Sequence, residues 1–255
     1  MRFGKYNYIN TEDKLQALDE FLMDGDEPRF KLQAFDTETN GLELYKTIVV
    51  GFSLSVDSDS GFYIPLLEWV PDPKSFKKKK IDKVEWEVFE HGWFRDVWRE
   101  GETYEEFSTP KDYQPPDFIK LYVKRWFEKV NLIMHNAPFD VNHTKINFGV
   151  DLTDNVLLDT ALLSHILNEN SRNGLKETAE EWKEALGINP YVMANTEQKE
   201  LGNSVIKNGG TYNARTKHVW RSDPKPMGKY GCADTFLTMG LYEVGMQRFI
   251  EGLGS

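Results

Sequence analysis

The sequence has one cysteine, no long apolar run and fewer basic than acidic residues (31 against 41), and each of these features argues against a class of protein. The single cysteine, Cys232, cannot form a disulfide within the chain, which is typical of a protein in a reducing cytoplasm. No apolar run approaches the length of a membrane span, and the first ten residues are too polar for a signal peptide. We therefore expect a cytoplasmic protein without a membrane partner.

The net charge of −10 and the isoelectric point near 5.1 argue against a protein that coats nucleic acid, because such proteins carry basic surfaces. They do not exclude an enzyme that holds a few nucleotides at a metal-filled acidic centre, since bound cations reverse the local charge. Apolar and aromatic residues make up 40% and 13% of the chain, which is typical of a folded globular protein. Its 255 residues suffice for one substantial core, with or without insertions.

Hydrophobic periodicity and turn residues divide the chain into strands and helices. Turn-type connections between the second, third and fourth strands indicate an antiparallel meander. Helices interleaved with a later strand then favour an α/β fold with a mixed sheet flanked by helices. Strands are predicted at residues 6–9, 29–36, 47–56, 61–66 and 131–135, and helices at 12–22, 117–129, 138–148, 156–167, 175–186 and 228–251.

Two segments interrupt this pattern. Residues 67–116 contain clustered prolines, four tryptophans and the lysine run 77–80, with too little apolar content for a core of their own. We interpret them as an insertion on a single domain spanning residues 1–255, with the lysines in a solvated loop and the tryptophans in a small packed cluster. Residues 188–227 are predicted to be irregular.

Two carboxylates stand close together at the end of a predicted strand. In the segment AFDTETNGL, Asp36 and Glu38 are two residues apart, so their side chains project from the same face. Like charges this close oppose each other's ionisation. We therefore expect a cation to lie between them.

Two later segments carry further polar residues at the ends of elements. HNAPFD places Asn136 at the end of a strand and Asp140 in the first turn of a helix. KYGCADTFLT places Tyr230 and Asp234 four residues apart, on one face of a helix. Taken singly, each has an ordinary structural interpretation as a cap, a dipole partner or a core residue. Only their combination with the first pair indicates chemistry.

The order Asp-x-Glu, Asn-x-x-Phe-Asp and Tyr-x-x-x-Asp resembles the three motifs of the DEDD exonuclease superfamily, in its tyrosine branch. The segment LLDTALLSHILNENSRNGLKETAEEW resembles the helical stretch of 3′–5′ proofreading domains in family A, polymerase I-like (phage-type) DNA polymerases, where an Asp-Thr and a Gly-Leu-Lys-x-x-Ala recur. The resemblance covers residues 28–66, 118–187 and 228–245. It implies a ribonuclease H-like mixed β-sheet flanked by helices, with residues 67–116 and 188–227 as insertions.

Hydrolysis of a phosphodiester needs an activated water and a stabilised leaving oxygen, and two divalent ions about 3.5–4 Å apart supply both. Mg²⁺ and Mn²⁺ prefer oxygen ligands such as carboxylates. The resemblance implies that Asp36 contacts both ions and that Glu38 and Asp234 hold the ion carrying the attacking water. Asp140 would act on the second ion, directly or through water. Tyr230 would orient the attacking water with its hydroxyl.

The resemblance also implies residues that grip the terminal nucleotides, with Phe139 or Leu42 packing against bases. This set is Thr37, Gly41, Leu42, Asn136 and Phe139. A basic stretch before the third motif is the candidate for phosphate contacts, and it consists of Arg215, Lys217, His218, Arg221, Lys225 and Lys229. Because this branch uses tyrosine where its sister branch uses histidine, three histidines are expected to be structural: His135, His143 and His165.

Three functions stay open on this basis. The first is a metal-dependent 3′–5′ exonuclease that proofreads single-stranded or frayed DNA 3′ ends, in the host cytoplasm if the protein is phage-encoded. The second is an RNase D-like exoribonuclease, which would tolerate a 2′-hydroxyl. The third is a non-catalytic nucleic-acid or polymerase docking module, although all four acids and the tyrosine are present. Because only one helix follows Asp234, we expect a polymerase module to act with this chain in cis or in trans, the chain being an excised domain or half of a split enzyme.

Overall fold

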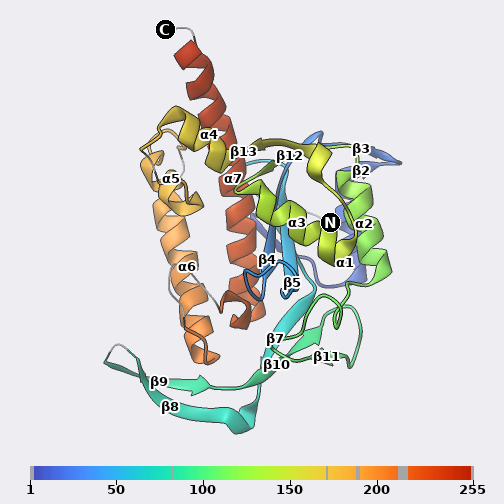
Figure 1. The fold of residues 1–255 in the computed structure, drawn as a ribbon, viewed down its shortest axis with the longest axis vertical. Helices are drawn as coiled ribbons and strands as arrows, with labels where there is room; N and C mark the ends of the chain where they lie inside the picture. Colours follow the sequence, from blue (N-terminus) through green and yellow to red (C-terminus); the bar gives the residue numbers. More distant parts are fainter. Residues whose placement is uncertain (1–2, 82, 171, 188–189, 212–217, 254–255) are drawn as a thin grey trace.

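The computed structural model describes residues 3–81, 83–170, 172–187, 190–211 and 218–253, with a six-stranded sheet at the centre (Figure 1). The strand order is β1-β6-β5-β4-β12-β13. Strands β4, β5 and β6 form the predicted antiparallel meander, whereas β12 runs parallel to β4 and β13, and β1 runs parallel to β6. The strands are β1 (Tyr6–Tyr8), β4 (Leu32–Thr39), β5 (Val49–Ser55), β6 (Gly61–Pro65), β12 (Asn131–Met134) and β13 (Val156–Asp159).

Helices cover both faces of this sheet (Figure 1). On one face, Phe35 of β4 packs against Phe127 of α2, Phe52 of β5 packs against Phe148 of α3, and α1 lies beside α2. On the other face, α7 contacts the sheet, and α4, α5 and α6 pack against α7. The helices are α1 (Glu12–Leu22), α2 (Asp117–Phe127), α3 (Ala137–Phe148), α4 (Thr160–Leu167), α5 (Leu175–Glu181), α6 (Pro190–Lys207) and α7 (Pro224–Leu253).

Two glycines allow α7 to lie directly on the sheet. A β-carbon at Gly61 of β6 would come within 2.6 Å of the carbonyl oxygen of Cys232 in α7. One at Gly231 of α7 would come within 2.6 Å of the ring of Tyr63 in β6. Side chains do not pack at such distances, so the absence of a β-carbon at both positions sets the height of α7 above the sheet. This close approach brings Asp234, on the same helix, down to strand β4.

Residues 67–116 extend the main core. Strands β7, β10 and β11 form a small antiparallel sheet, and β8 and β9 form a hairpin that projects from the body (Figure 1). Trp69 and Phe94 pack edge to face within the main hydrophobic core, and both contact Trp220. The remaining elements are β2 (Met23–Asp24), β3 (Glu27–Pro28), β7 (Leu67–Pro71), β8 (Phe76–Ile81), β9 (Val84–Phe89), β10 (Gly92–Asp96), β11 (Thr103–Tyr104) and the 3₁₀ turns η1 (Pro73–Ser75), η2 (Thr153–Asn155) and η3 (Val219–Arg221).

The lysine run is solvent-exposed as predicted, but the prediction of a loop is wrong, because these lysines lie in strand β8. Lys77 pairs with Val88 and Lys79 with Trp86 across the hairpin. Four adjacent lysines do not favour a strand by themselves, whereas valine and tryptophan do. The residues of β9 therefore stabilise β8 through cross-strand side-chain pairs. A partner strand therefore decided the structure of this segment.

Three further boundaries differ from the predictions. Residues 188–227 are not irregular throughout, because α6 packs against α7 and buries Leu201 and Val205. Residues 156–159 form β13 rather than a helix start, because they pair with β12. The strand predicted at 29–36 begins and ends three residues later, so that β4 carries both Asp36 and Glu38 within the ladder.

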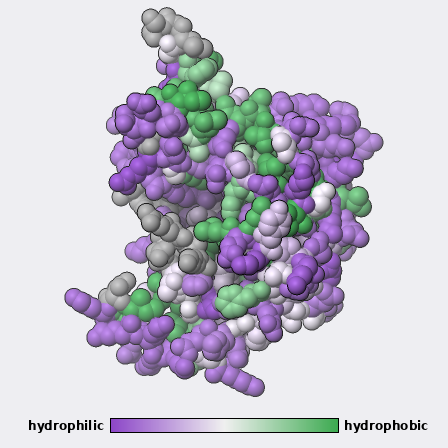
Figure 2. Space-filling model, viewed as in Figure 1, coloured by the Kyte–Doolittle hydropathy of each residue, from purple (hydrophilic) through white to green (hydrophobic). Residues whose placement is uncertain are grey.

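The face of the molecule in Figure 2 is largely hydrophilic, with hydrophobic residues gathered over α4. Leu162 and Ile166 of α4, together with Leu157 of β13, are the large apolar side chains that are more than half exposed there. Within the described part of the chain, no helix is both long enough and apolar enough to cross a membrane.

Candidate functional site

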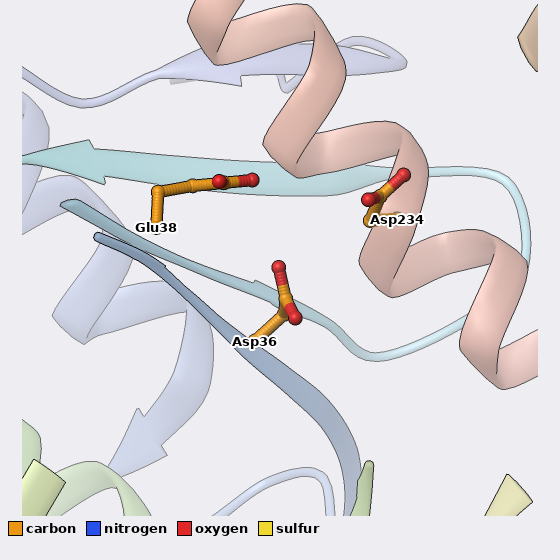
Figure 3. A group of neighbouring side chains, drawn as sticks. All are labelled: Asp36, Glu38 and Asp234. Carbon is orange, nitrogen blue, oxygen red and sulfur yellow. The ribbon is translucent and has the colours of Figure 1, made fainter. Parts of the chain in front are cut away.

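Three of the four predicted acids converge in the space between β4 and α7 (Figure 3). Asp36 and Glu38 project from β4, and Asp234 projects toward them from α7. One carboxylate oxygen from each residue lies within 4.8 Å of the others. The alternation of side chains along β4 accounts for the first two, and the glycine-mediated approach of α7 accounts for the third.

The carboxylates of Asp36 and Glu38 are held in an environment that disfavours their charge. Burial raises the pKa of Asp36 to about 7, although the nearby Lys176 ammonium opposes this shift. Burial, and then the charge of Asp36, raise the pKa of Glu38. The side chain of Glu38 is 7% exposed, and its Oε1 has no hydrogen-bond partner among the described residues. An unpartnered buried carboxylate oxygen is costly unless a cation or a proton satisfies it.

The residues present fit a divalent metal ion. All three donors are carboxylate oxygens, which Mg²⁺ and Mn²⁺ prefer over sulfur or nitrogen. The unpartnered Oε1 of Glu38 and the mutual repulsion of three acids both favour a bound cation. Asp36, Glu38 and Asp234 are therefore the candidate metal ligands of this chain.

Asp140 lies next to this group, although its carboxylate is not one of the three that converge. It stands in the first turn of α3, and its Oδ1 accepts hydrogen bonds from the backbone N–H of Thr37 at 2.8 Å and from its hydroxyl at 2.6 Å. Burial, and then the charge of Asp36, raise the pKa of Asp140. The hydroxyl of Thr37, predicted to contact nucleotides, thus holds Asp140 beside the other acids.

A separate aspartate fixes the start of α3 and thereby the position of Asp140. Asn136 takes the left-handed conformation, with φ of 67°, and its N–H donates to Asp159 at 2.9 Å. The N–H of Ala137 donates to the other carboxylate oxygen of Asp159 at 2.8 Å. Asn tolerates this conformation better than most residues. The Asp-Thr pair noted in the sequence therefore has a structural use at the end of β13.

The three histidines expected to be structural lie in different surroundings. His135 Nε2 lies 2.8 Å from the carbonyl oxygen of Asn173, which can only accept, so the neutral ring carries its proton on Nε2. Its Nδ1 then accepts from the hydroxyl of Thr160 at 2.9 Å. His143 is buried, and burial lowers its pKa to about 4. His165 is exposed on α4.

Lys176 is one site residue that sequence analysis missed. It lies in the first turn of α5, and its Nζ forms an ion pair with Oδ1 of Asp234. The same Nζ lies 5.0 Å from the centroid of the Tyr230 ring. Its side chain is 21% exposed, and burial lowers its pKa to about 8. The sequence pointed to Lys176 only through the Gly-Leu-Lys-x-x-Ala pattern of the resemblance. That pattern does not indicate that α5 packs against α7.

A pocket of about 130 Å³ opens beside the acids. Four of the five residues predicted to grip nucleotides line it, and Asn136 is not among the residues of its wall. Leu42 forms a projecting edge and is 67% exposed. Thr39 and two residues of η3 complete the wall, and no sequence pattern had indicated them. The lining residues are Thr37, Glu38, Thr39, Gly41, Leu42, Phe139, Val219, Trp220 and Tyr230.

The prediction that Arg221 contacts phosphate is wrong. This residue is buried, forms an ion pair with Glu106 and lies with its guanidinium 4.9 Å from the ring centroid of Trp69. It therefore joins η3 to the segment 67–116 instead of facing solvent. Lys229 pairs with Glu200 at 2.7 Å, and Lys225 is exposed. Arg215 and Lys217 lie outside the described residues.

The mixed sheet with acids on β4 and a long helix across it defines a ribonuclease H-like fold, as the sequence predicted. No protein-family model and no curated protein matches the chain. One similar solved structure is the apo form of a nuclease, with 16% identity and a TM-score of 0.52 over 97% of this chain and 82% of that chain.

Two further similar structures come from named organisms. The catalytic core of RRP6 from Trypanosoma brucei has 13% identity and a TM-score of 0.51 over 98% of this chain, which spans 54% of that one. The EXO domain of Nibbler from Aedes aegypti has 12% identity and a TM-score of 0.50 over 96% of this chain and 88% of that chain. At these identities the likeness concerns the fold.

The raised carboxyl pKa values predict how the metal-free protein responds to pH. Asp36 titrates near 7 when folded and near 4 when unfolded, so the folded state holds the extra proton between these values. The contribution of Asp36 to the free energy of unfolding therefore falls as pH rises from about 4 to about 7. In EDTA, the Asp36→Asn variant should match the wild type near pH 4.5. Near pH 7.5 the variant should be more stable by on the order of 1–4 kcal/mol.

The measurement is urea denaturation of both proteins across this pH range. Taking the difference between them removes the contribution of His143, which has the opposite sign because its folded pKa is depressed. A difference that stays constant with pH would contradict the raised pKa of Asp36.

Proposed function

We propose that this chain is a metal-dependent 3′–5′ exonuclease of the DEDD superfamily, in its tyrosine branch, that releases nucleotides from DNA 3′ ends. The observation that carries the proposal is the convergence of Asp36, Glu38 and Asp234 within 4.8 Å, with Asp140 held beside them. These acids come from three elements that are far apart in the sequence. Tyr230 lines the adjoining pocket, where a terminal nucleotide could lie.

The chain's own residues then have separate tasks. Asp36, Glu38 and Asp234 would hold the divalent ions, which supply the activated water and stabilise the charge of the leaving oxygen. Thr37 keeps Asp140 oriented toward this centre through two hydrogen bonds. The hydroxyl of Tyr230 would position the attacking water, which lowers the entropic cost of reaching the transition state.

The pocket favours a substrate end that is unpaired. The pocket is small, about 130 Å³, so we expect it to take a single unpaired base, and its walls include the aromatic side chains of Phe139 and Trp220. Apolar and aromatic walls accept any base by packing and stacking, so little sequence preference is expected. A 3′ terminus would therefore need to separate from its complement before reaching the acids. This requirement suits the removal of mismatched ends, and we include a polymerase module, in cis or in trans, as the partner that such proofreading serves.

The RNase D-like alternative, a nuclease that trims RNA, is the second candidate. The substrate sugar separates the two candidates, because only an RNA enzyme must accept a 2′-hydroxyl.

The test is digestion of end-labelled oligonucleotides of DNA and RNA with Mg²⁺, Mn²⁺ or EDTA. We expect 5′-labelled DNA to yield a ladder that shortens from the 3′ end, with no products in EDTA. A mismatched primer end should be removed faster than a matched end, because its pairing is already lost. Faster digestion of RNA would favour the second candidate. Equal rates on matched and mismatched ends would contradict proofreading, and a chain without any nuclease activity would favour the non-catalytic docking module.

A further inference from the structure

A lysine occupies the metal-binding side of the candidate centre. The Nζ of Lys176 contacts Oδ1 of Asp234, one of the three residues whose oxygens converge. The ring of Tyr230 lies 5.0 Å from the same ammonium, within the range of a cation–π contact.

The position of Lys176 is fixed by the packing of α5. Thr178 and Ala179 of this helix are buried, and Ala179 and Trp182 form a hydrophobic cluster with Leu237 and Leu241 of α7. Lys176 precedes this anchored segment by two residues, and Asp234 precedes Leu237 by three. The same interface that joins α5 to α7 thus aligns the ammonium with the carboxylate. A lysine on a free surface would lack this constraint.

The ammonium and a divalent ion compete for the same carboxylate. An ammonium in contact with Asp234 neutralises one of the negative charges that a metal ion would neutralise. Two cations at one carboxylate repel each other in a partly buried site. Binding of a metal ion to Asp234 therefore weakens the ion pair with Lys176.

We propose that Lys176 is the resident counter-ion of this centre, stabilising the clustered acids in the metal-free protein and leaving Asp234 when a divalent cation binds. The proposal rests on the proposed function, because it takes the acids to be metal ligands. It implies that Lys176 stabilises the metal-free site and at the same time lowers the affinity of the site for metal. The divalent cation would then bind only at concentrations high enough to displace the ammonium from Asp234.

The first test is the affinity for Mn²⁺ of the full chain without nucleic acid, measured by isothermal titration calorimetry near pH 7.5. Lys176→Met should bind Mn²⁺ more tightly, on the order of tenfold, because the competing cation is gone. Its melting temperature in EDTA should fall, because buried carboxylates lose their partner. Lys183→Met is the matched control, since Lys183 follows α5 on the surface and pairs with Glu180. Equal or weaker Mn²⁺ binding by Lys176→Met would overturn the proposal.

A second measurement needs no variant and therefore does not depend on the folding of Lys176→Met. The acetylation rate of each lysine in the wild type can be followed by mass spectrometry, in EDTA and in saturating Mn²⁺. Lys176 should react several-fold faster with Mn²⁺ because release from Asp234 exposes its amine, while Lys183 should not change. An unchanged rate at Lys176 would show that metal binding leaves the ion pair in place.

These outcomes are distinguishable from failure of the proposed function. A wild type that digests 3′ ends, together with unaltered Mn²⁺ affinity in Lys176→Met, would overturn the counter-ion role alone. A wild type that binds Mn²⁺ but digests no nucleic acid would overturn the exonuclease, while tighter binding by Lys176→Met would still support the counter-ion role.

Discussion

Replacement of Asp36 by asparagine should lower the rate of 3′-end hydrolysis by on the order of 10³-fold or more, which corresponds to about 4 kcal/mol of transition-state stabilisation. Asp36 is central to the acidic group, because it converges with Glu38 and Asp234 and its charge also acts on Asp140. Asparagine has the same shape but no negative charge, so it holds a divalent cation poorly. The fold should persist, since the change removes a repelling charge from the metal-free cluster.

The measurement is single-turnover digestion of a 5′-labelled oligonucleotide in Mg²⁺, with the melting temperature recorded in EDTA. Asp154→Asn is the matched control, because Asp154 is exposed in η2 and has no part in the cluster. Its activity should equal that of the wild type. If Asp36→Asn kept more than about a tenth of the wild-type rate, the assignment of these acids as metal ligands would be wrong.

Tyr230→Phe should lower turnover by about 10- to 100-fold, while the affinity for Mn²⁺ stays the same. Tyr230 lies one helical turn before Asp234 and lines the pocket beside the acids. The substitution removes only the hydroxyl, so the ring still packs against Lys176 and the wall of the pocket is preserved. A residue that positions the attacking water contributes to the rate without holding the metal ion.

Asp234→Asn provides the contrast, because it should reduce both turnover and Mn²⁺ affinity. Tyr242→Phe, twelve residues further along α7, controls for the loss of a tyrosine hydroxyl on the same helix. Rates and Mn²⁺ titrations of the three variants form one experiment. A Tyr230→Phe variant that lost metal binding as fully as Asp234→Asn would contradict this division of roles.

The sequence alone determined those parts of the site that depend on regular local geometry. Alternation along a strand placed Asp36 and Glu38 on one face, and helical spacing placed Tyr230 one turn from Asp234. The antiparallel meander followed from short turn-type connections. Each of these inferences uses residues only a few positions apart, and backbone geometry fixes how such residues are oriented.

Contacts between distant segments were decided only by the tertiary structure. Lys176 meets Asp234 because α5 and α7 share a buried cluster, and Trp220 reaches the pocket because Arg221 ties η3 to Glu106. The strand at the lysine run and helix α6 likewise depend on their partners β9 and α7. Local periodicity carries no information about which element a side chain will meet. The acids could therefore be recognised from the sequence, whereas the lysine that pairs with Asp234 became apparent only from the packing of α5 against α7.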